Sequence, residues 1–98
     1  MKPNALLMNP KDNVVVCTKE LEAGEKLYYK KGDEWVTLTL KEQIPIWNKV
    51  AVRDILRGDN ILKYGEVIGQ SDCDILQGQC ASHLNIISMP RNYDDEIV

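Results

Sequence analysis

The chain has 98 residues, of which 44% are hydrophobic and 28% charged, and its 12 basic and 15 acidic side chains give a formal net charge of −3. This length accommodates one domain with a modest core, because a chain of this size buries only about 60–65% of its unfolded surface. The apolar content excludes a disordered chain at so low a net charge, and the mild acidity argues against a nucleic-acid binder with a concentrated basic face.

The apolar runs of the chain are too short for a transmembrane segment or a secretory signal, which need roughly 20 and 7–15 apolar residues respectively. We therefore expect a cytoplasmic protein with no membrane partner. The three cysteines, an odd number without a Cys-x-x-Cys pair, are expected to be reduced thiols. Cys80, three residues before His83, is the one candidate for thiolate chemistry.

Strand signals dominate the chain. The candidate strands are rich in β-branched residues or alternate apolar with polar ones, and they cover residues 14–18, 27–29, 35–40, 49–53 and 82–86. Residues 30–34 are predicted to form a hairpin loop. No helical periodicity extends beyond about two turns. The sequence predicts a mainly β protein with a single domain over residues 1–98, a core at about 9–88 and an acidic tail at 90–98.

The alternation also predicts which side chains are buried. Val36, Leu38 and Leu40 are expected on one face of their strand. In the last candidate strand, Leu84 and Ile86 are expected to point inward, with His83 and Asn85 on the opposite face.

An eight-residue unit occurs three times, at residues 20–27, 54–61 and 74–81. Each copy has an acid, an aliphatic residue, two variable residues, Gly, a polar residue, a variable residue and an apolar one. We expect the acid to accept backbone N–H groups at the start of a short helical turn, and the Gly to take a positive φ that ends it. The irregular spacing predicts a compact β fold with several strand–turn–strand corners and excludes a solenoid.

These units resemble those of the SAF domain, a small β-clip module. Residues 44–55 are similar to the Ile-Pro-x-Gly-His-Lys-Val-Ala-x-x-Asp-Ile segment of the altronate/galactarate dehydratase family, and residues 61–69 to its Ile-Lys-Tyr-Gly-x-x-Ile-Gly signature. Residues 12–16 followed by Leu21 and Gly24 resemble its first strand and turn. The resemblance covers residues 9–88 and implies an SAF-type β-clip with short helical turns.

Members of that family are hydro-lyases that remove water from sugar acids, typically with iron or manganese. Their SAF module is an N-terminal domain or a separate small subunit, and a larger part supplies most of the catalytic apparatus. The resemblance therefore implies a small subunit that completes the active site of a large dehydratase subunit on a sugar-acid substrate. It assigns a divalent metal to the complex and no metal ligand to this chain. A homo-oligomer of this chain is also compatible with the resemblance.

The sequence departs from the family where histidines are expected. Asn48 replaces the His of the Gly-His-Lys segment, and Trp47 replaces its Gly. The family's later His-x-His-x-His-Asn run aligns with Cys80, Ser82, Leu84 and Asn85, so that only the Asn is kept. His83 falls between these positions, and a one-residue bulge would return it to the site. Without these imidazoles, this chain is not expected to build a three-ligand metal site.

A dehydratase needs a base for the proton next to the carboxylate, an acid or metal for the departing hydroxyl, and cations for the carboxylate. We assign catalytic roles to Lys63, Tyr64 and His83. Lys63 would pair with the substrate carboxylate and Tyr64 would donate a hydrogen bond. The alternative is that Lys63 is a solvated side chain and Tyr64 a surface packing residue.

Substrate binding is assigned to Lys49, Asn48 and Asn85. Asn85 has a structural alternative, because Asn side chains often cap local backbone groups. Trp35 and Trp47 are interpreted as packing residues, with Trp47 at an interface.

A second hypothesis follows from the missing histidines. The chain would then be a non-catalytic SAF-type module that binds a small acidic ligand or a protein and has lost the chemistry. A flagellar-type assembly factor is disfavoured, because we find no secretory signal in the sequence.

Overall fold

The computed structural model describes residues 2–82 and 84–88, and these residues form nine strands without a helix. The strands are β1 (Ala5–Leu6), β2 (Val14–Cys17), β3 (Lys26–Lys31), β4 (Glu34–Thr39), β5 (Lys49–Ala51), β6 (Asn60–Lys63), β7 (Glu66–Ser71), β8 (Cys80–Ala81) and β9 (Ile86–Ser88). Every strand pair is antiparallel. The prediction of a mainly β protein is confirmed for the described residues.

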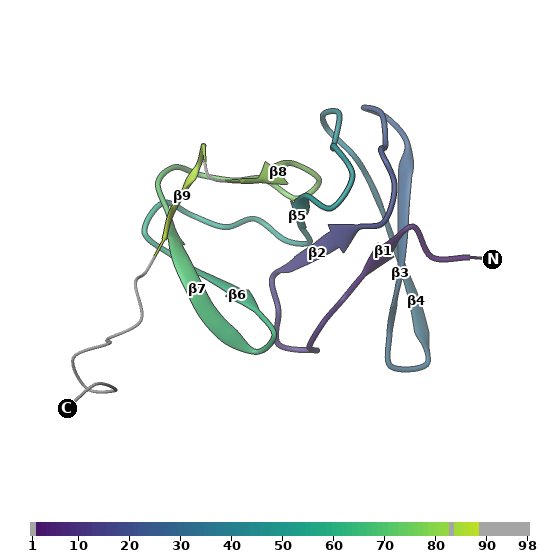
Figure 1. Ribbon diagram of the computed structural model, residues 1–98, viewed down its shortest axis with the longest axis horizontal. Coiled ribbons are helices and arrows are strands. Elements are labelled where there is room, and N and C mark those ends of the chain that lie inside the picture. Colours follow the sequence, from purple (N-terminus) through teal and green to yellow (C-terminus); the bar gives the residue numbers. More distant parts are fainter. Residues whose placement is uncertain (1, 83, 89–98) are drawn as a thin grey trace.

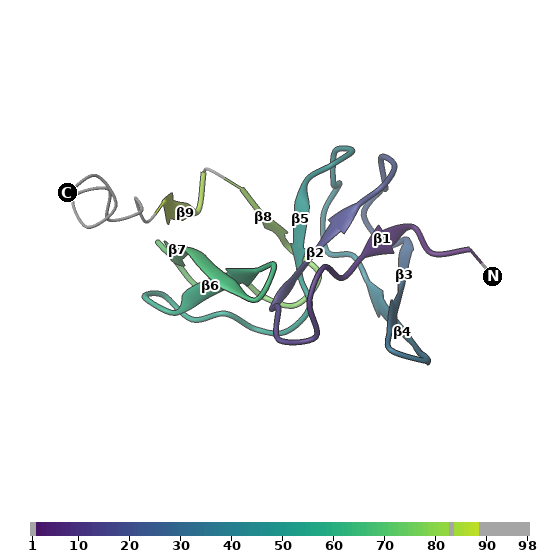
Figure 2. The same cartoon turned by 60° about the horizontal axis from the view of Figure 1, so that its bottom comes forward.

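A four-stranded sheet with the order β1-β2-β5-β8 lies in the middle of the molecule. The β3–β4 hairpin lies on one side of it and the β6–β7 hairpin, extended by β9, on the other (Figures 1 and 2). Two apolar clusters result: Val15 and Val50 face the first hairpin, whereas Val14 and Ala51 face the second. β2 is buried on both faces, which explains its continuous run of apolar residues.

The alternation predicted for β4 is confirmed, because Leu38 and Leu40 are buried whereas Trp35 is 40% exposed. The predicted hairpin loop at residues 30–34 was too long. Lys30 and Lys31 continue β3 and pair with β4, which leaves a two-residue turn. Gly32 allows this tight turn because its φ is +63°.

The repeated units form reverse turns at residues 22–25, 56–59 and 76–79, and the expected short helical turns are absent from the described residues. In each turn the backbone N–H of the fourth residue donates to the carbonyl of the first, at 2.9 to 3.1 Å. The Gly at the third position has a φ between +86° and +90°, as predicted. Such a φ at this position is typical of a type II turn, which closes the chain in four residues without helical winding.

A fourth copy of the turn lies at residues 45–48 and was missed in the sequence. Asn48 donates to the carbonyl of Pro45 at 3.1 Å, and Trp47, with a φ of +67°, occupies the glycine position. In all four turns the N–H of the third residue donates to a backbone carbonyl outside the turn, at 2.8 to 2.9 Å. The pairs are Gly24 with Leu40, Trp47 with Cys17, Gly58 with Ser71, and Gly78 with Ala51. The fold therefore contains four equivalent corners.

The corners are joined in pairs. Leu21 forms a β-bridge with Ile44, and Ile55 forms one with Ile75. Within the second pair the acids act across the pair: Asp54 accepts from the N–H of Gln77 at 2.8 Å, and Asp74 accepts from the N–H of Arg57 at 2.9 Å. The expectation that each acid caps its own turn was wrong for these two copies, because the partner turn lies nearer to the carboxylate.

The strand predicted at residues 82–86 was also wrong at its centre. Leu84 and Asn85 lie in a turn, Asn85 donates its N–H to the carbonyl of Ser82 at 3.0 Å, and β9 begins only at Ile86. Leu84 is 82% exposed at this turn and does not point inward. No helix within residues 2–82 and 84–88 is long and apolar enough to span a membrane.

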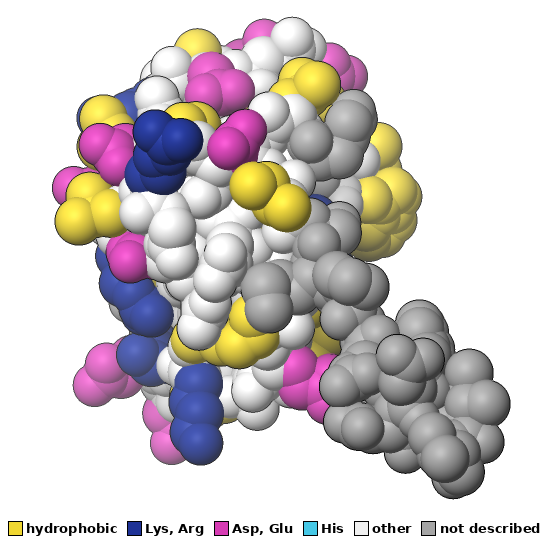
Figure 3. All heavy atoms as spheres, turned by 90° about the vertical axis from the view of Figure 1, so that its left-hand side faces the viewer, with side chains coloured by type: hydrophobic (Ala, Val, Ile, Leu, Met, Phe, Trp, Pro, Cys, Tyr) yellow, Lys and Arg dark blue, Asp and Glu magenta, His cyan; other side chains and the backbone are white. Residues whose placement is uncertain are grey.

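On the face shown in Figure 3, basic side chains lie beside acidic ones and are separated by scattered apolar groups. The described residues of this face therefore carry charges of both signs next to one another.

Candidate functional site

The tip of the β6–β7 hairpin carries Lys63 and Tyr64, two of the predicted catalytic residues. Tyr64 and Gly65 have φ values of +59° and +73°, which are typical of a type I′ turn. Asp12 is buried beneath this tip, and its carboxylate accepts the N–H groups of Tyr64 and Gly65 at 2.9 and 2.8 Å. Asp12 therefore fixes the conformation that presents Lys63 and Tyr64.

Lys63 and Lys49 form a cationic pair between β6 and β5. The Lys63 ammonium lies 5.0 Å from the centre of the Tyr64 ring. Lys49 is half-buried, and its pKa is lowered mainly by burial and then by the charge of Lys63. No carboxylate of the described residues is among the charges that shift the Lys49 pKa. Cys80 acts in the opposite sense and raises the Lys49 pKa. The like charges of Lys49 and Lys63 favour binding of an anion.

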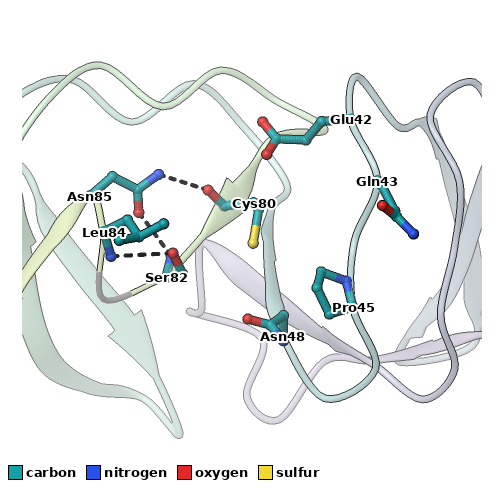
Figure 4. Close-up of a pocket in the computed structure, with 8 residues that line it drawn as sticks. All are labelled: Glu42, Gln43, Pro45, Asn48, Cys80, Ser82, Leu84 and Asn85. Carbon is teal, nitrogen blue, oxygen red and sulfur yellow. Dashed lines mark hydrogen bonds between the residues drawn. The ribbon is translucent and has the colours of Figure 1, made fainter.

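A cavity of about 380 Å³ lies between the loop that precedes β5 and the segment that follows β8 (Figure 4). Its lining residues are Glu42, Gln43, Pro45, Asn48, Cys80, Ser82, Leu84 and Asn85. The cavity brings together Asn48 and Asn85, both predicted to bind substrate, although 37 positions separate them in the sequence (85 − 48). Glu42 is its one charged residue among the described lining.

Asn48 owes its place in the cavity to the proline of its own turn. In the three sister turns the fourth residue, Glu25, Asp59 or Gln79, accepts the N–H of the first residue at 2.8 to 2.9 Å. Pro45 has no N–H, so this capping bond is not available at the fourth turn. The Asn48 amide instead makes one long bond of 3.3 Å to the carbonyl of Ile46 and can act toward a ligand.

Asn85 uses both ends of its amide on the backbone. Its Nδ2 donates to the carbonyl of Cys80 at 2.8 Å, and its Oδ1 accepts the N–H of Ser82 at 2.8 Å. These bonds tie Asn85 to Cys80 and Ser82 and give it the structural role considered as its alternative. Its assignment to substrate binding stays a prediction.

The predicted residues thus fall into two groups. Lys63 and Tyr64 lie at the hairpin tip with Lys49 near them, and Asn48 and Asn85 line the cavity. Asn48 and Lys49 are consecutive, which connects the groups. His83 lies outside the described residues.

Sequence reasoning missed Asp12 and Glu42. Asp12 is part of the segment compared with the family's first strand, but nothing in that pattern indicates that its carboxylate reaches a hairpin about 50 residues further on. Glu42 belongs to no motif in the sequence and becomes visible only as part of the cavity wall.

Comparison with known proteins decides the family. Residues 3–89 match the profile of the altronate/galactarate dehydratase SAF domain. The chain belongs to this family. The match covers almost all of the described residues, including both candidate groups of the site.

Curated relatives of the SAF domain are lyases or their subunits. The chain is 28% identical over 88 residues to altronate dehydratase of Bacillus subtilis. It is 34% identical over 67 residues to altronate dehydratase of Escherichia coli. The chain spans only 16% and 13% of the length of these two proteins. It is 33% identical over 67 residues to the (2R)-sulfolactate sulfo-lyase subunit alpha of Chromohalobacter salexigens, of which it spans 71%.

The donor groups of the described residues do not fit the iron or manganese that the family resemblance implies. Within residues 2–82 and 84–88, no three His, Cys, Asp or Glu side chains come together as a metal site. Cys80 lines the cavity, but burial and then the charge of Glu42 raise its pKa, which disfavours the thiolate that binds metals. The cavity can offer amide and hydroxyl groups to a polar ligand.

The three thiols should differ sharply in reactivity. Cys17 is buried, and burial followed by the nearby Cys80 raises its pKa to about 11, whereas Cys73 is exposed. We expect iodoacetamide at pH 8 to alkylate Cys73 first and Cys17 only after unfolding, as followed by peptide mass spectrometry. Alkylation of Cys17 at the rate of Cys73 in the folded protein would contradict the buried position.

The Cys17 pKa also predicts how stability depends on pH. Burial holds the pKa of the folded Cys17 thiol above its ordinary value of 9.0, so the contribution to stability is complete below pH 9 and is lost as the pH rises toward 11. We expect a loss of up to about 2 kcal/mol over this window. Urea unfolding should show this loss in the wild type and a flatter profile in Cys17→Ala.

Proposed function

We propose that this SAF domain is the small subunit of an altronate/galactarate-type hydro-lyase and completes the active site of a large partner subunit. The observation that carries the proposal is the similarity to the sulfo-lyase subunit alpha, a protein named as a subunit, of which the chain spans 71%. The relatives named altronate dehydratase are far longer than this chain, which supports a division of labour between this module and a larger body.

The cationic pair supports a substrate with a carboxylate. Lys63 lies at a tip that Asp12 holds in place, and the charge of the half-buried Lys49 adds to the field at that point. A carboxylate held there would leave the Tyr64 hydroxyl and the Asn48 amide as hydrogen-bonding groups for sugar hydroxyls. The divalent metal of such a complex would be held by the partner, because the described residues of this chain do not supply its ligands.

Reconstitution tests the proposal directly. The chain is co-expressed with a candidate large lyase subunit, such as one encoded in an adjacent reading frame, and the complex is assayed for dehydration of altronate and galactarate. We expect a stable complex that is active, with neither chain active alone. A monodisperse chain that binds no candidate large subunit, or a complex inactive on every sugar acid tested, would overturn the proposal.

The contribution of Lys63 is tested with a matched lysine. We expect Lys63→Met to raise KM of the complex about 30–100-fold, because one charge-assisted contact to a carboxylate is lost. Lys30→Met is the control, since the Lys30 ammonium also lies over an aromatic ring, 5.3 Å from the centre of Trp35, on the other hairpin. Steady-state kinetics of both variants measure the difference. Equal effects of the two substitutions would remove Lys63 from substrate binding.

The second candidate function is a non-catalytic SAF-type binding module. It is favoured by the engagement of the Asn85 amide in its own turn and by the uncharged cavity lining outside Glu42. Metal analysis of the purified chain tests the non-catalytic function at the single imidazole of the sequence. Stoichiometric iron, manganese or zinc that is lost in His83→Ala would contradict the non-catalytic function.

A further inference from the structure

Trp47 is anomalous among the four equivalent turns. The other three turns place Gly at the same position, with φ between +86° and +90°, and Trp47 is held at +67°. A left-handed conformation is costly for a bulky residue and is maintained only where the surroundings enforce it. Here its N–H bond to the Cys17 carbonyl at 2.8 Å and the return bond from Cys17 to Asn48 at 2.9 Å fix the turn.

The strained Trp47 gains little packing within the described residues in return. Its side chain is 62% exposed, and Ile46 beside it is 46% exposed. Leu84, on the cavity wall, is 82% exposed. An exposed Trp with an exposed aliphatic neighbour is typical of the anchors of protein–protein interfaces.

The position of the turn identifies what covers it. Pro45 and Asn48, which flank Ile46 and Trp47 in the same turn, both line the cavity (Figure 4). A body that covers Trp47 therefore also reaches the cavity rim. The described lining of the cavity offers one charged residue, Glu42, so an active site at the cavity needs further charged groups from that body. The same face of a second copy would bring only the same lining, with Glu42 as its charged residue.

We propose that Trp47, with Ile46, anchors this SAF domain in an apolar pocket of the large lyase subunit, beside the shared cavity. This inference rests on the proposed function. It places the interface at the corner of the fold that differs from its three equivalents. The Trp side chain is kept at a glycine position because it is buried on association.

The test replaces Trp47 with the residue of the sister turns. In Trp47→Gly we expect the Tm of the isolated chain to stay at or above the wild-type value, because the left-handed strain is relieved. Binding to the large subunit should weaken at least ~30-fold, the effect of losing a central Trp anchor. Trp47→Phe, which keeps an apolar ring, should retain most of the affinity. Trp35→Leu is the control for loss of an exposed Trp elsewhere, and its affinity should be unchanged.

Isothermal titration calorimetry and analytical ultracentrifugation separate the outcomes. If the wild type binds and Trp47→Gly binds equally well, the inference is wrong while the proposed function stands. If the wild type binds no large subunit, both are wrong. Self-association that Trp47→Gly abolishes would assign the anchor to a second copy and overturn the inference. A large fall in the Tm of Trp47→Gly would show that Trp47 packs within its own chain, and would also overturn it.

Discussion

Gly78→Ala is expected to lower the free energy of unfolding by about 3 kcal/mol, a large part of the stability of a domain of this size. Gly78 has a φ of +90°, which L side chains rarely adopt. A Cβ at this position would also lie 2.5 Å from the carbonyl oxygen of Thr39, which belongs to backbone and cannot rotate away. Strain and overpacking therefore add at one residue.

The sister turn supplies the control for Gly78→Ala. Gly24 has nearly the same φ, +86°, but an added Cβ would meet nothing within 4 Å. Gly24→Ala should therefore cost only about 1 kcal/mol, from the backbone conformation alone. The difference between the two variants in urea unfolding measures the close approach of Gly78 to Thr39. Equal losses in the two variants would contradict that contact.

Much of the fold is readable from local patterns. The alternation at Leu38 and Leu40 and the three glycine turns reflect backbone sterics and burial, which act over a few residues. The fourth turn was hidden because Trp47 stands where the pattern requires Gly. Asp54 and Asp74 each accept an N–H group from the other's turn, and the sequence does not indicate this because it depends on the pairing of the two turns in space.

The site was predictable to a smaller degree. Lys63 and Tyr64 are neighbours in the sequence, so their proximity at the hairpin tip follows directly. The cavity, in contrast, forms from two segments about 40 residues apart, and no local pattern specifies that they meet. Gly69 lies in β7, where a Cβ would come within 2.6 Å of the Ile87 carbonyl oxygen. Such a close approach depends on tertiary packing.

Asp12→Ala is expected to lower the free energy of unfolding by about 2–3 kcal/mol, because two hydrogen bonds to a charged acceptor are lost together. The Asp12 carboxylate is buried and accepts the N–H groups of Tyr64 and Gly65. Without it, the left-handed conformation of Tyr64 loses its main support. Amide hydrogen exchange at Tyr64 and Gly65 should accelerate more than at the centre of β7, and urea unfolding gives the stability change.

Two further variants isolate the role of this carboxylate. Asp12→Asn keeps one acceptor oxygen and should lose about half as much stability as Asp12→Ala. Asp33→Ala removes the exposed acid from the turn of the other hairpin and should cost less than about 0.5 kcal/mol. If Asp12→Ala lowers the free energy of unfolding no more than Asp33→Ala does, the conformation of the β6–β7 hairpin tip does not depend on Asp12. If the tip does depend on Asp12, the same variant should raise KM in the reconstituted complex as Lys63→Met does, because a mobile tip no longer presents Lys63 to the carboxylate.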